Sequence, residues 1–226
     1  YYEIIDRYLQ LIHFTKGDNN SEIYTASNTI PFTLYSSYDY LSRFRLCRWM
    51  YQNGKIKTPH SLSDLKAPEK IINAHKKLGE NIKMNRKTYF IWDTCIFYSF
   101  VKEIKYFAEL GLISSTDVAI LKEELQQLLI ELESVKGKFN EDNELYIYLS
   151  NINFEATYSF ISKQDFQISL IRVFSINSMD SQSPYICQIQ KEWIQSLRRH
   201  STLITGSGEA QRIAYFQQQK KIIETL

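Results

Sequence analysis

The chain has 226 residues and a formal net charge of +2, with 27 Lys and Arg against 25 Asp and Glu. This length can bury a substantial core as one large domain or two small ones, so a fold that depends on disulfide or metal staples is not expected. Apolar residues (44%) and charged residues (23%) are near globular averages, and seven Gly and four Pro are few for an all-β chain, which favours a helical protein.

The first 35 residues are predicted to form a short helix and then a loop. Apolar residues at helical spacing indicate a helix over 1–16, and Gly17 stops it. Residues 21–35 contain Asn28, Pro31 and many hydroxyl side chains, which compete with the backbone for hydrogen bonds. We therefore expect a loop there.

Two further helices are predicted in the next part of the chain. One spans about 36–53, and Gly54 is placed to adopt the left-handed conformation that ends many helices. The other spans 68–78, where Pro68 suits the first turn and Gly79 closes the helix.

The centre of the predicted fold is an apolar helix over residues 88–110. Its apolar side chains surround nearly the whole circumference, as expected for a helix that is covered on most sides. Gly111 ends it, and Ser114 or Ser115 caps a following helix that reaches about Lys136. These two segments give the clearest signal of a helical hairpin.

The C-terminal part is predicted to hold four more helices. Residues 145–162 are rich in Tyr and Phe, and residues 166–176 are assigned to a helix although apolar and polar residues alternate at their start. A helix over 184–199 begins with a Ser-Pro pair, and the last helix spans 209–225.

These elements predict the all-α fold class, as a single irregular multi-helix domain of about eight helices around the central apolar helix 88–110. The domain spans residues 1–226, with a division into a basic N-terminal part, 1–87, and a helical core, 88–226, as the alternative. No fixed-period self-similarity is visible, so a repeat solenoid is not predicted.

Motifs of several common enzyme classes are absent. The four histidines are widely spaced and HExxH is missing, so a zinc hydrolase is not indicated. Gly206-Ser207-Gly208 lacks the surrounding residues of a serine hydrolase elbow, and a flexible turn explains it better. Neither GxxxxGK[ST] nor GxGxxG is present. We therefore predict neither a metal nor another cofactor.

Asp93 is the one candidate catalytic residue. It stands alone in the predicted apolar helix, where an unpaired carboxylate is costly unless it finds a partner. A core carboxylate bonded to a Tyr hydroxyl or an Arg is the simpler interpretation, and a functional acid in a cleft is the alternative. Asp93 is thus the first residue to mutate in a test for catalysis.

The strongest nonrandom feature is a basic segment over residues 43–87. It holds twelve Lys and Arg against three acids, a net charge of +9, which leaves −7 for the rest of the chain. Such segregation creates a positive field that attracts phosphate-bearing or acidic partners. The predicted partner-binding residues are Arg45, Arg48, Lys76, Lys77, Lys83, Arg86 and Lys87.

The basic segment also has other interpretations. It can form a solvated face, or it can dock against the acidic helix 115–136. That helix holds Glu123, Glu124, Glu131 and Glu133. If the segment binds a partner, its positive charge would attract an acidic protein and a phosphoinositide membrane alike, so both remain open. Phe44, Trp49 and Tyr51 have the side chains to stack on bases, but their helical spacing indicates core, so nucleic acid is not favoured.

Cysteine usage and hydropathy bear on the compartment. Cys47, Cys95 and Cys187 are far apart, so we expect reduced thiols in a cytoplasmic, reducing environment. The longest apolar run, 89–101, is about 13 residues long, whereas a membrane span needs about 20, so no transmembrane segment is predicted. The chain opens at Tyr1 without an initiator Met or a signal-type leader, which indicates processing or a fragment.

Stretches rich in Lys, Ile and Gln, such as ILKEELQQLL at 120–129 and FQQQKK at 216–221, resemble those of effectors that intracellular bacteria deliver by type IV secretion. The resemblance is one of sequence style and is spread over the whole chain. It implies a protein that acts in a host cytosol on host proteins or membrane lipids, and it transfers no functional residue.

Together, these features predict a helical domain that binds an anionic partner, either an acidic protein surface or a phosphoinositide membrane, through the basic segment. We expect binding rather than catalysis. The alternative is an enzyme, or a helical accessory domain of one, that uses carboxylates such as Asp93. The sequence indicates neither the partner's identity nor the oligomeric state.

Overall fold

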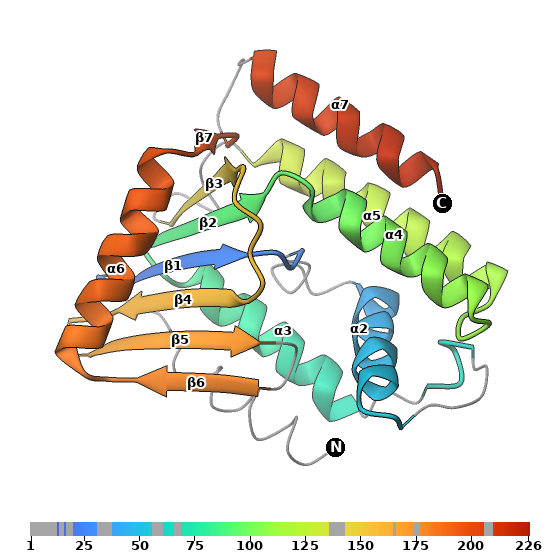
Figure 1. Ribbon diagram of the computed structural model, residues 1–226, viewed down its shortest axis with the longest axis horizontal. Helices are drawn as coiled ribbons and strands as arrows, with labels where there is room; N and C mark the ends of the chain where they lie inside the picture. The colour runs from blue at the N-terminus through green and yellow to red at the C-terminus, as the bar shows by residue number, and fades with distance from the viewer. Residues whose placement is uncertain are drawn as a thin grey trace.

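The computed structural model describes residues 20–30, 38–55, 61–65, 69–135, 143–164, 166–173, 177–205 and 210–226, with His13 and Lys16. These residues form an α/β fold in which six helices pack on a seven-stranded mixed sheet (Figure 1). The predicted all-α class is therefore wrong. The helix predicted over 1–16 lies outside the described residues, apart from His13 and Lys16.

The strand order of the sheet is β6-β5-β4-β1-β2-β3-β7. Its centre consists of three parallel strands, β1 (Glu22–Ser27), β2 (Lys87–Asp93) and β3 (Glu144–Ser150). Antiparallel strands extend it on both sides. They are β4 (Thr157–Ser162), β5 (Gln167–Val173) and β6 (Asn177–Ser181) beyond β1, and β7 (Thr202–Leu203) beyond β3.

Helices cover both faces of the sheet. On one face lies α6 (Pro184–Arg199), in front of the strands in Figure 1, with Ile194 and Leu197 in the same apolar cluster as Tyr24 and Ile91. The remaining helices belong to the other face. They are α2 (Asp39–Gln52), α3 (Glu69–Lys83), α4 (Ile96–Glu109), α5 (Ser115–Ser134) and α7 (Ala210–Glu224).

A row of aromatic rings runs across the parallel strands beneath α6. Tyr24, Tyr89 and Tyr146 are partners in register, and their rings stack with centroids 4.5 and 5.1 Å apart. The guanidinium of Arg198 on α6 lies 4.9 Å from the ring centre of Tyr89. Cross-strand aromatic pairs of this kind stabilise a register, so the row fixes how the three strands align.

The predicted central helix 88–110 is a strand, a turn and a helix. Lys87–Asp93 forms β2, and α4 begins only at Ile96. The five residues 88–92 are all buried, because helices cover both faces of this central strand. A strand buried on both faces is a continuous apolar run, which cannot be told from a buried helix by its periodicity.

Three other predicted segments also turn out to be strands. The predicted loop 21–35 contains β1, the predicted helix 145–162 is the pair β3 and β4, and the predicted helix 166–176 contains β5. The connection 151–156 between β3 and β4 contains two Asn and neither Gly nor Pro. Asn also tolerates turn conformations, so the low Gly and Pro counts underestimated the number of turns.

Several local predictions are confirmed. Helices occur near residues 36–53, 68–78, 115–136, 184–199 and 209–225, although the second continues past Gly79 to Lys83. Gly54 follows α2 with a φ of 63°, and Ser114 caps α5 in a capping box with Asp117. Cys47, Cys95 and Cys187 are free thiols, as predicted.

Asp117 joins the start of α5 to residues 61–65. Its side chain is 1% exposed, and its carboxylate accepts hydrogen bonds from the Ser114 backbone N (2.8 Å), Ser61 Oγ (3.1 Å) and Leu62 backbone N (3.0 Å). A negative charge at this end of α5 is also favoured by the helix dipole. Asp117 therefore anchors the segment between α2 and α3 to the core.

Asp117→Ala is expected to lower the free energy of unfolding by about 3 kcal/mol, because buried donors lose their acceptor. Asp117→Asn keeps one acceptor oxygen and should cost less. Urea unfolding followed by circular dichroism measures both variants. An Asp117→Ala variant as stable as the wild type would show that this carboxylate does not anchor the segment.

Candidate functional site

The carboxyl ends of the parallel strands meet at one edge of the sheet. Asn28 directly follows β1, Asp93 ends β2, and Asn153 lies three residues after the end of β3. In Figure 1 this edge is the one that faces α2 and α4. Open α/β sheets bind ligands in the crevice outside the carboxyl ends of their strands.

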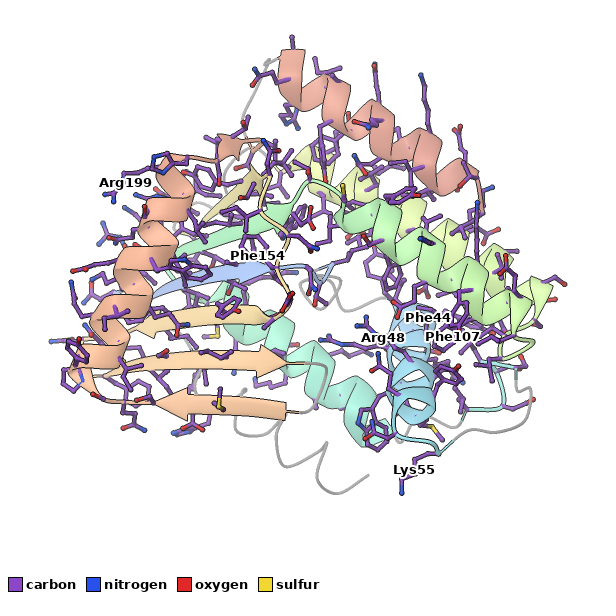
Figure 2. The ribbon with its side chains drawn as sticks, in the orientation of Figure 1. Phe44, Arg48, Lys55, Phe107, Phe154 and Arg199 are labelled. Atoms are coloured by element: carbon purple, nitrogen blue, oxygen red, sulfur yellow. The ribbon has the colours of Figure 1, made fainter. Side chains whose placement is uncertain are left out.

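A pocket of about 410 Å³ lies at this edge. Ten of the described residues line it, and most of them are polar. They are Asn28, Arg48, Asp93, Ile96, Ser99, Phe100, Lys102, Glu103, Tyr106 and Asn153. Figure 2 shows Arg48 projecting from α2 toward the sheet, whereas Lys55, just after the same helix, points away. The pocket thus combines two cations, two carboxylates and two amides.

Arg48 and Glu103 form an ion pair between α2 and α4. Arg48 Nε lies 3.1 Å from Glu103 Oε1, and the two side chains are 28% and 25% exposed. Among the described residues, the buried Nε finds no acceptor in hydrogen-bond geometry. Burial raises the pKa of Glu103, and the positive charge of Arg48 opposes that rise. The pair is therefore held by charge and leaves hydrogen-bonding capacity on the guanidinium.

Asp93 is half-buried at the end of a strand, not inside an apolar helix as predicted. Its Oδ1 accepts a hydrogen bond from the Cys95 backbone N at 2.8 Å, and the Thr94 backbone N donates to the Ser150 carbonyl at 3.1 Å. These two bonds fix the turn from β2 into α4. The predicted bond to a Tyr hydroxyl or an Arg is replaced by this backbone contact, and Asp93 lines the pocket.

The seven predicted partner-binding residues lie on α2, on α3, in the turn after α3 and at the start of β2. Arg48 lines the pocket at the carboxyl edge, and Arg45 lies one turn earlier on α2. The other five belong to α3, to the turn after it and to the start of β2, and only the start of β2 lies at the amino edge. They are Lys76, Lys77, Lys83, Arg86 and Lys87. Of the seven, Arg48 is the one that lines the pocket.

Several of these cations have acidic neighbours. Lys77 Nζ lies 3.5 Å from Glu80 Oε2, and Lys87 is in register with Glu22 on one side and Glu144 on the other. Burial lowers the pKa of Lys83, and the charges of Glu131 and Glu80 oppose that change.

The acidic helix α5 spreads its contacts over several elements. Glu131 influences Lys83, but Glu133 Oε2 pairs with Lys220 Nζ on α7 at 2.7 Å. Glu124 accepts hydrogen bonds from the backbone N of Tyr40 and of Leu41, at the start of α2. The basic segment therefore meets α5 at Glu131 through Lys83, and at Asp117 through Ser61 and Leu62.

Six polar residues of the pocket were not predicted as site residues from the sequence: Asn28, Ser99, Lys102, Glu103, Tyr106 and Asn153. Treating 88–110 as one helix hid the point at which a strand ends and the chain turns. The available signal was a polar residue at or within three residues of the end of each of three strand segments, which is where the ligand-binding edge of a parallel sheet lies.

No family model, curated protein or solved structure matches the chain. Among the described residues, no group of three or more His, Cys, Asp and Glu side chains is arranged to hold a metal ion. None of the helices in the described part of the chain is both long enough and apolar enough to cross a bilayer. The site is accordingly interpreted from its own geometry.

Arg48→Met is expected to destabilise the protein more at pH 8 than at pH 5. Without the guanidinium, the pKa of Glu103 rises further above its value in the unfolded chain, so the folded state holds a proton that the unfolded state releases. The contribution of Glu103 to the stability of this variant is then fully present below the pKa that Glu103 has in the unfolded chain. It is lost as the pH rises through the pKa of Glu103 in the folded state. The extra loss should be about 1 kcal/mol, since the pair is partly exposed.

Urea unfolding of the wild type and Arg48→Met at both pH values measures this difference. The double variant Arg48→Met/Glu103→Gln is the control and should lose the pH dependence. An equal loss of stability at both pH values would contradict a role for Arg48 as the counter-ion of Glu103.

Proposed function

We propose that the pocket at the carboxyl edge of β1, β2 and β3 binds a small polar ligand with a phosphate or carboxylate group. The observation that carries this proposal is the presence of Arg48 and Lys102 in one pocket at the end of a parallel sheet. A guanidinium presents a planar fork of donors that matches an oxyanion. Asn28 and Asn153 add donors and acceptors for the rest of the ligand.

The size of the pocket supports a small molecule. Its volume of about 410 Å³ falls in the range of roughly 300–1,000 Å³ that is typical of ligand sites. The anionic partner expected from the sequence is retained in this proposal, but its contact is a pocket to which only Arg48 of the basic segment contributes.

An enzymatic role of the same pocket rests on Asp93. Its carboxylate is half-buried and shares the pocket with Glu103, and positioned carboxylates serve as general acids and bases. Under this proposal Arg48 and Lys102 anchor the anionic group, and Asp93 acts on a proton of the bound ligand. Asp93→Asn should then retain ligand binding, because it removes a negative charge from the pocket and none of its cations.

Arg48→Ala should weaken the binding of pyrophosphate by about 30-fold, and Lys102→Ala by about fivefold, since Lys102 is exposed and its charge is screened by solvent. Isothermal titration calorimetry at low ionic strength measures both. Lys55→Ala is the matched control, because Lys55 follows α2 outside the pocket. Pyrophosphate affinity that is unchanged in both pocket variants would refute the proposal.

A second candidate function is docking on an anionic membrane through the amino edge of the sheet. Arg86 is exposed just before β2, Met84 just after α3 is 51% exposed, and Lys76 and Lys77 are exposed earlier on α3. Cations next to an exposed apolar side chain favour adsorption to an anionic lipid interface.

The triple variant Lys76→Glu/Lys77→Glu/Arg86→Glu should lose binding to vesicles that contain phosphoinositide, and wild-type binding should fall as NaCl rises from about 50 to about 300 mM. Sedimentation of vesicles measures this, with Arg48→Ala as the control that keeps the amino edge intact. Binding that persists in the triple variant would remove this candidate.

A further inference from the structure

We propose that Glu103 is an internal counter-ion that the ligand must displace from Arg48, and that this exchange selects a phosphoryl-type dianion over a monocarboxylate. The inference rests on the proposed function, because it concerns the ligand of the same pocket.

The first support is the way in which the pair is held. Phe44, one turn before Arg48 on α2, packs edge-on against Phe100 and Phe107 of α4, with ring centroids 5.4 and 5.3 Å apart (Figure 2). This aromatic cluster fixes α2 against α4, so Arg48 stays at the pocket without help from Glu103. The contact between Arg48 Nε and Glu103 Oε1 is close, at 3.1 Å, but Nε has no hydrogen-bond acceptor among the described residues. Glu103 therefore neutralises Arg48 without filling its hydrogen-bonding positions.

The second support is the charge balance of an exchange. A monocarboxylate ligand would replace one carboxylate with another at Arg48, so the exchange would contribute little binding free energy. A phosphoryl-type dianion brings a second negative charge, and Lys102, next to Glu103 on the same pocket, can match it. The net binding free energy of the exchange therefore depends on the second negative charge of the ligand.

The third support is the position of Glu103 once it is displaced. Its side chain is 25% exposed, and burial already raises the pKa of Glu103 against the opposing charge of Arg48. When the ligand binds the guanidinium, the positive charge of Arg48 is neutralised by the ligand. The pKa of Glu103 then rises further, and Glu103 takes up a proton from solvent. Because binding is coupled to proton uptake, affinity increases as the pH falls.

Other ionisable groups lie on the elements that surround the pocket or pack on α4. Arg45 precedes Arg48 on α2, Asp93 ends β2, and Tyr106 on α4 has its hydroxyl 3.3 Å from that of Tyr51. From α7, which also packs on α4, comes the buried phenol of Tyr215, whose pKa is raised by burial and by the charge of Asp93. Asp93 is the other carboxylate that lines the pocket, so the test must separate its effect from that of Glu103.

The test uses sulfate, which stays doubly charged between pH 5.5 and 8, and acetate as the monocarboxylate. Wild-type affinity for sulfate should increase about tenfold from pH 8 to pH 5.5, with an average uptake of about 0.4 proton over that range, while acetate binds weakly throughout. Calorimetry in buffers of different ionisation enthalpy gives the proton count and needs no variant. Acetate that binds as tightly as sulfate, or sulfate binding without proton uptake, would overturn the inference.

The matched pair of variants is Glu103→Gln and Asp93→Asn. Glu103→Gln should bind sulfate about tenfold more tightly than the wild type at pH 8 and lose the pH dependence, whereas Asp93→Asn should keep it. A Glu103→Gln variant that keeps the pH dependence, or an Asp93→Asn variant that loses it, would overturn the role of Glu103. If pyrophosphate binding still depends on Arg48 in that case, the proposed function survives, and if neither anion binds the wild type, both fail.

Discussion

The parallel, in-register pairing of β1, β2 and β3 is the constraint on which the rest of the structure depends. It places Asn28, Asp93 and the turn before Asn153 at one edge of the sheet, although they are far apart in the sequence. The stacked rings of Tyr24, Tyr89 and Tyr146 hold this register on the side of α6. A shift by one residue would move every side chain of a strand to the opposite face, so the pocket and the core are specified together.

The two edges of the sheet use their charges differently. At the amino edge, Lys87 stands between Glu22 and Glu144 in register, an arrangement that balances charge across the strands. At the carboxyl edge, Arg48 faces Glu103 from another helix and keeps an unsatisfied Nε within the described part of the chain. The charges at the amino edge thus stabilise the pairing of the strands. At the carboxyl edge, Arg48 can exchange Glu103 for a ligand.

The sequence predicted those elements whose signals are local. The Ser114 cap with Asp117, the left-handed Gly54 and the Ser-Pro start of α6 each mark a helix end within a few residues. The strands were missed because β2 is buried on both faces, where a strand has no period-2 signal. In β5 the alternation of Gln167, Ile168, Ser169 and Leu170 was visible, but it was outweighed by the helical composition of the chain.

The site was predicted only in fragments for a related reason. Asp93 was singled out as an isolated carboxylate and Arg48 as part of a charge run, and both line the pocket. Glu103 and Lys102 are ordinary surface residues of a helix until the turn at residues 94–95 is known. They can be recognised as pocket residues only when it is known which strand end lies beside α4, and this depends on the tertiary fold.

The central claim is that the carboxyl edge of the three parallel strands is the ligand-binding edge. An amide NMR titration with pyrophosphate tests it most directly, because it reports which backbone positions respond. The account predicts shifts that cluster at residues 28, 48, 93–103 and 153 and leave residues 83–87 unchanged. Shifts confined to the amino edge, or scattered evenly over the chain, would contradict it.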